Sequence, residues 1–273
     1  MNLRYRLLVV DIDGTLQGRS RAISAEDIAA LAEVRDFGVQ VALSTGRVVQ
    51  ACSEVLSKLS LNKGYHIFFD GALVVSPECG HEVYAEPLDP VVLEEAIEFA
   101  HLEDIPLELY SATHYFAEQE NWSTQAHRQF FGLEPTMGAF DGLWERERII
   151  KGGLVALSHD EADKVMTFCK QFDGSLHFSW ARTPAYPGVG FINVLAPGVS
   201  KGRALEALAL HLGIPLDEVV AIGDGANDIP LLSTVGLAIV MGNATDDVKA
   251  VADYVTSDVD HNGVAAAIKK FLL

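Results

Sequence analysis

Apolar and polar positions alternate along the first eighty residues in blocks that fit strands and helices in turn. A continuous apolar run at 7–10 is typical of a strand that is buried on both faces of a sheet. Ser24 can cap a helix over 25–37, in which apolar residues recur at helical spacing before Gly38. Two further strands are expected at 39–43 and 66–69, with a helix between them at 48–59. Strands that alternate with helices of this length predict βαβ units and a parallel sheet.

The same alternation returns after residue 198, whereas the segment between has a different character. The last part is expected to form helices over 201–212, 229–234, 246–252 and 264–272 and strands over 219–222, 237–241 and 254–256. Residues 82–197 hold most of the Trp, Tyr and Pro and several short alternating runs, with helices expected over 90–101 and 161–172. We therefore predict an α/β parallel-sheet core, formed by residues 1–81 and 198–273, that is interrupted by an α+β domain over residues 82–197.

The composition agrees with two folded domains and argues against some classes of partner. The chain has 273 residues, of which 49% are hydrophobic and 21% are charged. Both values are typical of a soluble globular protein of this length. The formal net charge is −18, and such a protein repels nucleic-acid phosphates and anionic lipid head groups. We expect neither nucleic acid nor membrane as a partner, and an anionic substrate would need a local cation.

The cysteine count and the apolar runs favour a cytoplasmic protein. The three cysteines are scattered, which fits neither a disulfide framework nor a zinc site. No apolar run is long enough for a signal-peptide core or a membrane helix. The sequence leaves open whether the protein is a monomer or a homodimer.

Three of the expected strands run directly into polar segments. These segments are Asp11-Ile12-Asp13-Gly14-Thr15, Ser44-Thr45-Gly46-Arg47 and Gly223-Asp224-Gly225-Ala226-Asn227-Asp228. Because the carboxyl ends of parallel strands share one edge of a sheet, we expect these segments to converge there. The convergence would place four carboxylates in one pocket: Asp11, Asp13, Asp224 and Asp228.

Such crowding requires a cation. Two carboxylates ~4 Å apart repel by roughly 4 kcal/mol at an effective dielectric constant of 20. Oxygen ligands without His or Cys favour a hard ion, and a few carboxylates together with a substrate phosphate are the usual surroundings of Mg²⁺. We therefore expect Mg²⁺ as the cofactor.

Other residues of these segments suit a phosphate group. Ser44 offers a hydroxyl, and Thr45 and Gly46 offer backbone N–H groups at an expected helix start. Lys201, in Gly198-Val199-Ser200-Lys201-Gly202, supplies a positive charge at the start of another helix. No Ser–His pair suggests itself as a nucleophile, so a carboxylate that attacks phosphorus fits best.

In this order, the four segments resemble the motifs of the haloacid dehalogenase (HAD) superfamily. More narrowly they resemble its Cof-type, or subclass IIB, sugar-phosphate phosphatases, in which a large α+β cap of the C2B type is inserted into a Rossmann-like core. The resemblance covers the whole chain.

The resemblance implies a role for each matching residue. Asp11 would be the nucleophile and a metal ligand, and Asp13 the general acid/base, with its backbone carbonyl on the metal. Asp224 would complete the metal site and Asp228 would be an outer metal partner. The phosphoryl group would be held by Ser44, Thr45, Gly46, Lys201 and Asn227, with Asn227 either on the phosphate or positioning Lys201.

Two positions depart from the family pattern, both on the side where the substrate is expected. Asp70-Gly71-Ala72 stands where the family usually has Asn-Gly-Ala, and Asn193 stands where it often has an acidic residue. We place Arg47, Asp70, Gly71 and Asn193 on the substrate side.

The sequence thus predicts a Mg²⁺-dependent phosphomonoesterase that acts on a small phosphorylated metabolite through an aspartyl-phosphate. A sugar phosphate is the first expectation and a compound like pyridoxal phosphate the second. A phosphomutase of the same fold, or a non-catalytic regulatory protein that kept the fold, is the alternative.

Overall fold

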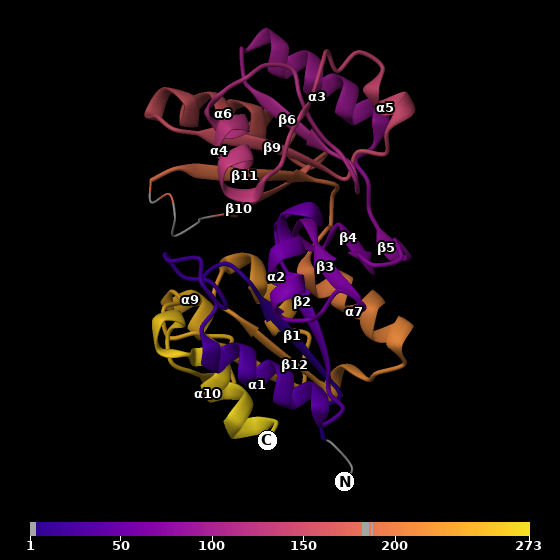
Figure 1. Ribbon diagram of the computed structural model, residues 1–273. Helices are drawn as coiled ribbons and strands as arrows, with labels where there is room; N and C mark the ends of the chain where they lie inside the picture. The colour runs from indigo at the N-terminus through magenta and orange to yellow at the C-terminus, as the bar shows by residue number, and fades with distance from the viewer. Residues whose placement is uncertain (1–3, 182–185, 187) are drawn as a thin grey trace.

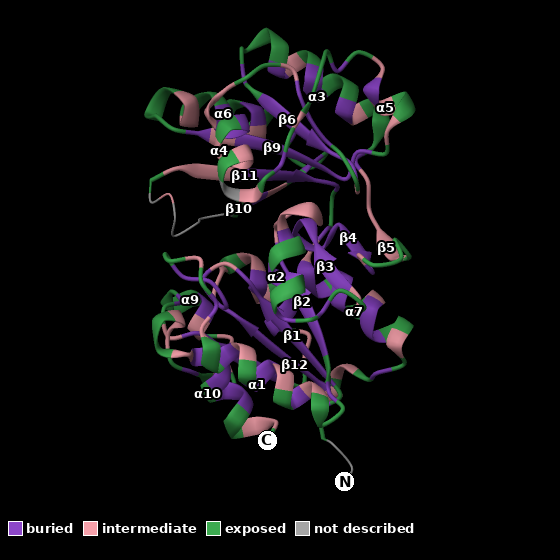
Figure 2. Cartoon of the chain, viewed as in Figure 1, coloured by how far each residue is buried: buried purple, intermediate pink, exposed green. Residues whose placement is uncertain are grey.

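The computed structural model describes residues 4–181, 186 and 188–273. The chain forms two sheets, each with its own helices, which make up the lower and upper parts of the molecule in Figure 1. The strands of both sheets are largely buried (Figure 2). No helix in the described ranges is both long enough and apolar enough to cross a membrane.

The first sheet has eight strands in the order β14-β13-β12-β1-β2-β3-β4-β5. The strands are β1 (Leu7–Asp11), β2 (Gln40–Ser44), β3 (His66–Phe68), β4 (Leu73–Val75), β5 (Glu82–Ala85), β12 (Val219–Gly223), β13 (Leu237–Val240) and β14 (Tyr254–Val255). The pairs from β14 to β3 are parallel, whereas β4 and β5 add an antiparallel edge. The parallel core is therefore the part that the alternating pattern predicts.

Helices cover both faces of this sheet. They are α1 (Ala25–Asp36), α2 (Ser53–Lys58), α7 (Lys201–Leu212), α8 (Ile229–Leu232), α9 (Asp246–Lys249) and α10 (Gly263–Phe271). The sides of β1 divide between two apolar clusters: Leu8 and Val10 pack with residues of α1 and α10, and Leu7 and Val9 with residues of α7 and α8. Burial on both faces explains why β1 is apolar without alternation.

The register of the central strands places the polar segments together. Leu7 of β1 lies opposite Gln40 of β2 and opposite Val219 of β12. Asp11, at the carboxyl end of β1, lies opposite Ser44, at the carboxyl end of β2. The loops that follow β1, β2 and β12 therefore leave the sheet at one edge, which is where ligands bind in open parallel sheets.

The second sheet has six strands in the order β10-β11-β9-β6-β7-β8. The strands are β6 (Leu107–Tyr110), β7 (Tyr115–Ala117), β8 (Thr136–Met137), β9 (Lys151–Ala156), β10 (His177–Ala181) and β11 (Gly190–Leu195). The helices of this part are α3 (Pro90–Leu102), α4 (Trp122–Phe131), α5 (Leu143–Arg146) and α6 (His159–Gln171). The pairs are antiparallel except that of β7 with β8. We call this part the cap.

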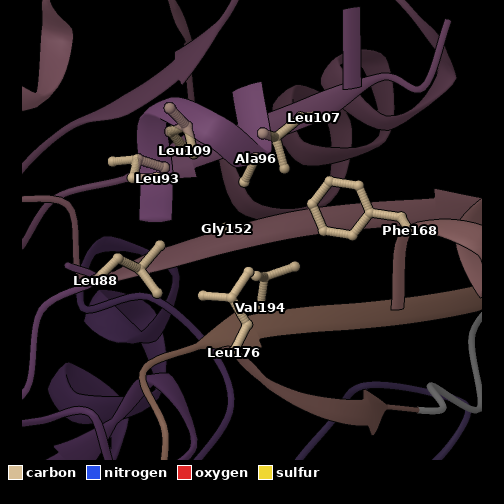
Figure 3. Close-up of a pocket in the computed structure, with 9 residues that line it drawn as sticks. All are labelled: Leu88, Leu93, Ala96, Leu107, Leu109, Gly152, Phe168, Leu176 and Val194. Carbon is tan, nitrogen blue, oxygen red and sulfur yellow. The ribbon is translucent and has the colours of Figure 1, made fainter. Parts of the chain in front are cut away.

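The cap has an apolar interior of its own. A small pocket between α3, α6 and the sheet is lined by nine residues, none of which has a polar side chain (Figure 3). Phe168 of α6 lies there, fully buried, with Phe99 and Phe172 at ring-centroid distances of 6.0 and 4.9 Å. Such a pocket belongs to the packing of the cap and offers nothing to a phosphate.

The expected fold class, a parallel-sheet α/β core with an inserted α+β domain, is confirmed. The boundaries at 82 and 197 stay predictions, and β5, which starts at Glu82, is hydrogen-bonded into the first sheet. The expected elements recur within a few residues, except that the segment 48–59 begins with a 3₁₀ turn at Gln50–Cys52 before α2. The pattern did not predict α4, α5, β4, β5, β8 or β11.

We expect Phe168→Ala to lower the free energy of unfolding by about 3–5 kcal/mol, because it removes a ring from the packed interior of the cap. Met166→Ala changes an exposed residue of the same helix and should stay within about 0.5 kcal/mol of the parent. Urea unfolding followed by circular dichroism measures both. Equal losses in the two variants would contradict this account of the cap interior.

Candidate active site

The site is built by the loops after β1, β2 and β12 and by the first residue of α7. Ser200 caps α7 by accepting a hydrogen bond from the backbone N–H of Arg203, at 3.2 Å. This cap fixes the first turn of the helix. Lys201 therefore starts the helix with its side chain directed among the three loops, although it is 190 residues from Asp11 in the chain.

Lys201 is the centre of the site. Its ammonium donates to Asp11 Oδ1 at 2.7 Å and to Asp228 Oδ1 at 2.6 Å, with a longer bond of 3.4 Å to the carbonyl of Ser44. The side chain is completely buried. Burial lowers the pKa of the lysine, but Asp11 and Asp228 outweigh it and raise the pKa above its ordinary value. The group therefore stays charged.

Three of the four expected carboxylates gather beside this lysine. One oxygen each of Asp11, Asp224 and Asp228 lie within 4.8 Å of one another. Burial raises the pKa of Asp11 well above its ordinary value, and Asp228 adds to this while Lys201 opposes it. Burial and Asp228 likewise raise the pKa of Asp224 to about 7. One ammonium does not offset three crowded carboxylates.

The donor set fits a hard divalent cation. All three ligand groups are carboxylates, and burial together with repulsion from Asp228 raises the pKa of both Asp11 and Asp224, so a bound cation would stabilise their ionised forms. Asp224 is held in place by Thr15 Oγ1 at 2.9 Å and Asn243 Nδ2 at 3.1 Å. Asp228 accepts from the backbone N–H groups of Asp224 and Gly225. These contacts orient the carboxylates before any ion binds.

The carboxylate of Asp13 does not join the cluster. It forms a two-pronged ion pair with Arg47, with Nε–Oδ2 and Nη2–Oδ1 distances of 2.7 and 2.5 Å. Arg47 also donates to Gln17 at 2.7 Å and lies over the ring of Phe131 from the cap. Asp13 remains close enough to raise the pKa of Asp224. Arg47 thus lies between Asp13 and the cap.

The loop after β2 differs in part from the expected phosphate cradle. Ser44 Oγ is buried and has no hydrogen-bond partner among the described residues. The backbone N–H of Thr45, however, donates to the carbonyl of Ile67 at 2.9 Å, so it is already occupied. No helix starts here either, since the 3₁₀ turn begins only at Gln50. A side chain at Gly46 would collide with Asp70, because an added Cβ would lie 2.8 Å from its Oδ1.

Asp70 joins the cap to the core. Its carboxylate accepts from Asn193 Nδ2 of β11 at 2.6 Å and from Asn227 Nδ2 at 2.8 Å. Burial raises the pKa of Asp70, but Lys201 and the two amides outweigh it, so the pKa falls below its ordinary value. The next residue, Gly71, has a φ of +102°, and an added Cβ would lie 2.2 Å from the carbonyl oxygen of Ser200. Only glycine fits between this turn and the start of α7.

Sequence reasoning assigned no role to Thr15 and did not find Gln17, Asn243 and Lys151. Thr15 and Asn243 lie just beyond the carboxyl ends of β1 and β13, so position after an apolar strand was a usable signal. The ammonium of Lys151, at the start of β9, lies 3.4 Å from the carbonyl oxygen of Gly46. For Lys151, the only signal in the sequence was its position at the start of an apolar strand.

The sequence and the structure both match known proteins over nearly their whole length. A family model described as haloacid dehalogenase-like hydrolase matches residues 8–268. A protein of Yersinia pseudotuberculosis named HMP-PP phosphatase is 30% identical, over 90% of this chain and 86% of its own. A protein of Bacillus subtilis named 5-amino-6-(5-phospho-D-ribitylamino)uracil phosphatase is 28% identical, over 98% and 96%.

Solved structures of proteins from the same family are similar to this chain over nearly its whole length. A haloacid dehalogenase-like hydrolase from Bacteroides thetaiotaomicron superposes with a TM-score of 0.83 at 25% identity, over 97% of this chain and 99% of its own. A sugar phosphatase of haloacid dehalogenase subclass IIB superposes with a TM-score of 0.79 at 26% identity, over 98% and 100%.

We expect Mg²⁺ to raise the melting temperature, because an ion that binds only the folded protein stabilises it, by about 2.7 kcal/mol at a hundredfold excess over its Kd. Asp224→Asn should remove most of this shift, whereas Asp246→Asn, on an exposed residue of α9, should keep it. Thermal melts with and without MgCl₂ measure the effect. An equal shift in both variants would place the ion elsewhere.

Proposed function

We propose that this chain, which belongs to the haloacid dehalogenase-like hydrolase family and is a phosphatase, hydrolyses a small phosphomonoester through an aspartyl-phosphate on Asp11, with Mg²⁺ as cofactor. The observation that carries the proposal is the buried contact of Lys201 with Asp11 and Asp228, next to the hydroxyl of Ser44, which has no hydrogen-bond partner in the described part of the chain. A buried hydroxyl and a buried ammonium beside a carboxylate are suited to a phosphoryl group. A sugar phosphate is our first choice of substrate, in line with the subclass IIB relative.

In the first step, a carboxylate oxygen of Asp11 attacks phosphorus. The new P–O bond forms as the bond to the leaving oxygen breaks, and Asp13 gives its proton to that oxygen. Lys201 favours the ionised form of Asp11, because the ammonium lowers a pKa that burial and Asp228 raise above its ordinary value. The same ammonium and the Ser44 hydroxyl would hold the oxygens of the transferring group.

In the second step, Asp13 takes a proton from water as the water oxygen attacks phosphorus. The bond to Asp11 breaks, and inorganic phosphate leaves with the nucleophile restored. An ionised Asp13 is the form that can accept this proton, and its ion pair with Arg47 holds such a carboxylate in one orientation. We assign Arg47 the positioning of Asp13 in this step.

Asp11 and Asp224 would hold Mg²⁺ with the backbone carbonyl of Asp13, and Asp228 would support them from outside. The ion supplies positive charge against the phosphoryl oxygens, where most of the catalytic stabilisation of phosphoryl transfer lies. Lys201, by contrast, carries its charge permanently at the site. The two cations would together offset part of the negative charge of three carboxylates and an incoming dianion.

We expect the two leading aspartates to respond differently to the leaving group. Asp11→Asn should abolish turnover of every substrate, because it removes the nucleophile. Asp13→Asn should slow an alkyl phosphate by about 10²–10⁴-fold. An acyl phosphate needs no proton for departure, so Asp13→Asn should still release its acyl group in a rapid first turnover. Steady-state and rapid-quench kinetics on both substrates measure this.

The products test the remaining alternative within enzymes. Released inorganic phosphate is the expected product, whereas an isomerised phosphoester would identify a phosphomutase. Full activity of Asp11→Asn on either substrate would overturn the assignment of the nucleophile.

A further inference from the structure

The cap contributes one buried cation to the edge of the site. Lys151 opens β9, and its ammonium donates to the carbonyl of Gly46, in the loop that also carries Ser44, at 3.4 Å. The residue is 8% exposed, and its ammonium lies 5.1 Å from the centre of the Tyr110 ring. Neither proposed step of hydrolysis uses the ammonium of Lys151.

The two buried lysines of the described chain differ in their partners. Lys201 is paired with two carboxylates, whereas Lys151 forms no ion pair with any described residue. Asp70 and Glu108 are the carboxylates that raise the pKa of Lys151, and both already accept hydrogen bonds from other side chains. Asp70 accepts from Asn193 and Asn227, and Glu108 accepts from the hydroxyls of Tyr110 and Tyr115 at 2.6 and 2.7 Å. The ammonium of Lys151 can therefore donate further hydrogen bonds to a ligand.

A buried ammonium in this state favours an anionic ligand. Burial lowers the pKa of Lys151 to about 8, and Asp70 and Glu108 only partly oppose it. A charge that is withdrawn from water without a counter-ion is costly, so an incoming anion gains more here than it would at the surface. His127 of α4 also faces this group, and its own pKa is lowered by burial and by Lys151 despite the effect of Glu108.

The position of Lys151 indicates which part of a substrate it would meet. The groups that we assign to the transferring phosphoryl, Asp11, Ser44 and Lys201, all come from the core, whereas Lys151 comes from the cap. It contacts the outer end of the same loop, at Gly46, two residues beyond Ser44. A phosphoryl group beside Ser44 would direct its leaving group towards the residues that the cap adds.

We propose that Lys151 is a specificity-determining residue that binds a second anionic group, a carboxylate or a second phosphate, on the leaving-group half of the substrate. This inference rests on the proposed phosphatase function. It narrows the substrate class to phosphomonoesters that carry a further anion.

Competition against turnover of p-nitrophenyl phosphate with Mg²⁺ tests the proposal. Two matched pairs of competitors differ by one anion: 3-phosphoglycerate with glycerol 3-phosphate, and fructose 1,6-bisphosphate with fructose 6-phosphate. We expect the inhibition constant to be about tenfold lower, or more, for the competitor with the extra anion in at least one pair, as for a charge-assisted hydrogen bond. The pair that shows the preference distinguishes a carboxylate from a phosphate.

Lys151→Met should bring that ratio close to one, while its kcat on p-nitrophenyl phosphate stays close to that of the parent. Its melting temperature should not fall, because the substitution removes an unpaired buried charge; a purely structural lysine would give a fall. Lys164→Met, on an exposed lysine of α6, is the matched control and should keep the ratio.

Three results would overturn the proposal: no preference for the extra anion in the wild type, an unchanged ratio in Lys151→Met, or an equal loss for both members of each pair. Failure to hydrolyse p-nitrophenyl phosphate at all would instead count against the proposed phosphatase function.

Discussion

The ion pairs of Lys201 with Asp11 and Asp228 are the interaction on which the rest of this site depends. Three carboxylates share a buried pocket, and each close pair repels by roughly 4 kcal/mol at ~4 Å and an effective dielectric constant of 20. The buried ammonium of Lys201 offsets part of this repulsion and holds two of the three groups by direct hydrogen bonds. A divalent cation would offset negative charge that the ammonium leaves uncompensated.

The same lysine links parts of the chain that are far apart. Asp11 ends β1, Asp228 follows β12, and Lys201 starts α7 directly after the chain returns from the cap. The turn at Gly71 packs against the start of α7, and Asp70 in that turn binds the cap through Asn193. A few buried polar contacts therefore connect the cap with the carboxylates of the site.

Most of the core and the acidic cluster could be predicted from sequence because both depend on local patterns. Asp11, Ser44 and Asp224 each follow an apolar strand, so the geometry of a parallel sheet was enough to bring them together. The antiparallel pair β4 and β5 was not predicted, because short apolar runs at a sheet edge have no distinctive period. Among its described residues, helix α4 buries only the polar Ser123 and Thr124, so it lacks the buried apolar positions that reveal a helix in a sequence.

The side-chain partnerships were out of reach for a different reason. That Arg47 would take Asp13 away from the cluster, or that the Thr45 N–H would be used by Ile67, depends on how strands and cap pack in three dimensions. Lys151 is the clearest example, because its significance lies in the absence of a carboxylate partner among the described residues, and no sequence motif records that.

We propose that Asp11 carries the phosphoryl group during turnover. Acid quenching of the wild-type protein within the first turnover of a phosphomonoester, followed by peptide mass spectrometry, tests it most directly. We expect one added phosphoryl group on the peptide that contains Asp11, and this group should disappear when substrate is exhausted. A phosphoryl group on Ser44, or no phosphoenzyme under conditions in which burst kinetics show a first-turnover product, would contradict it.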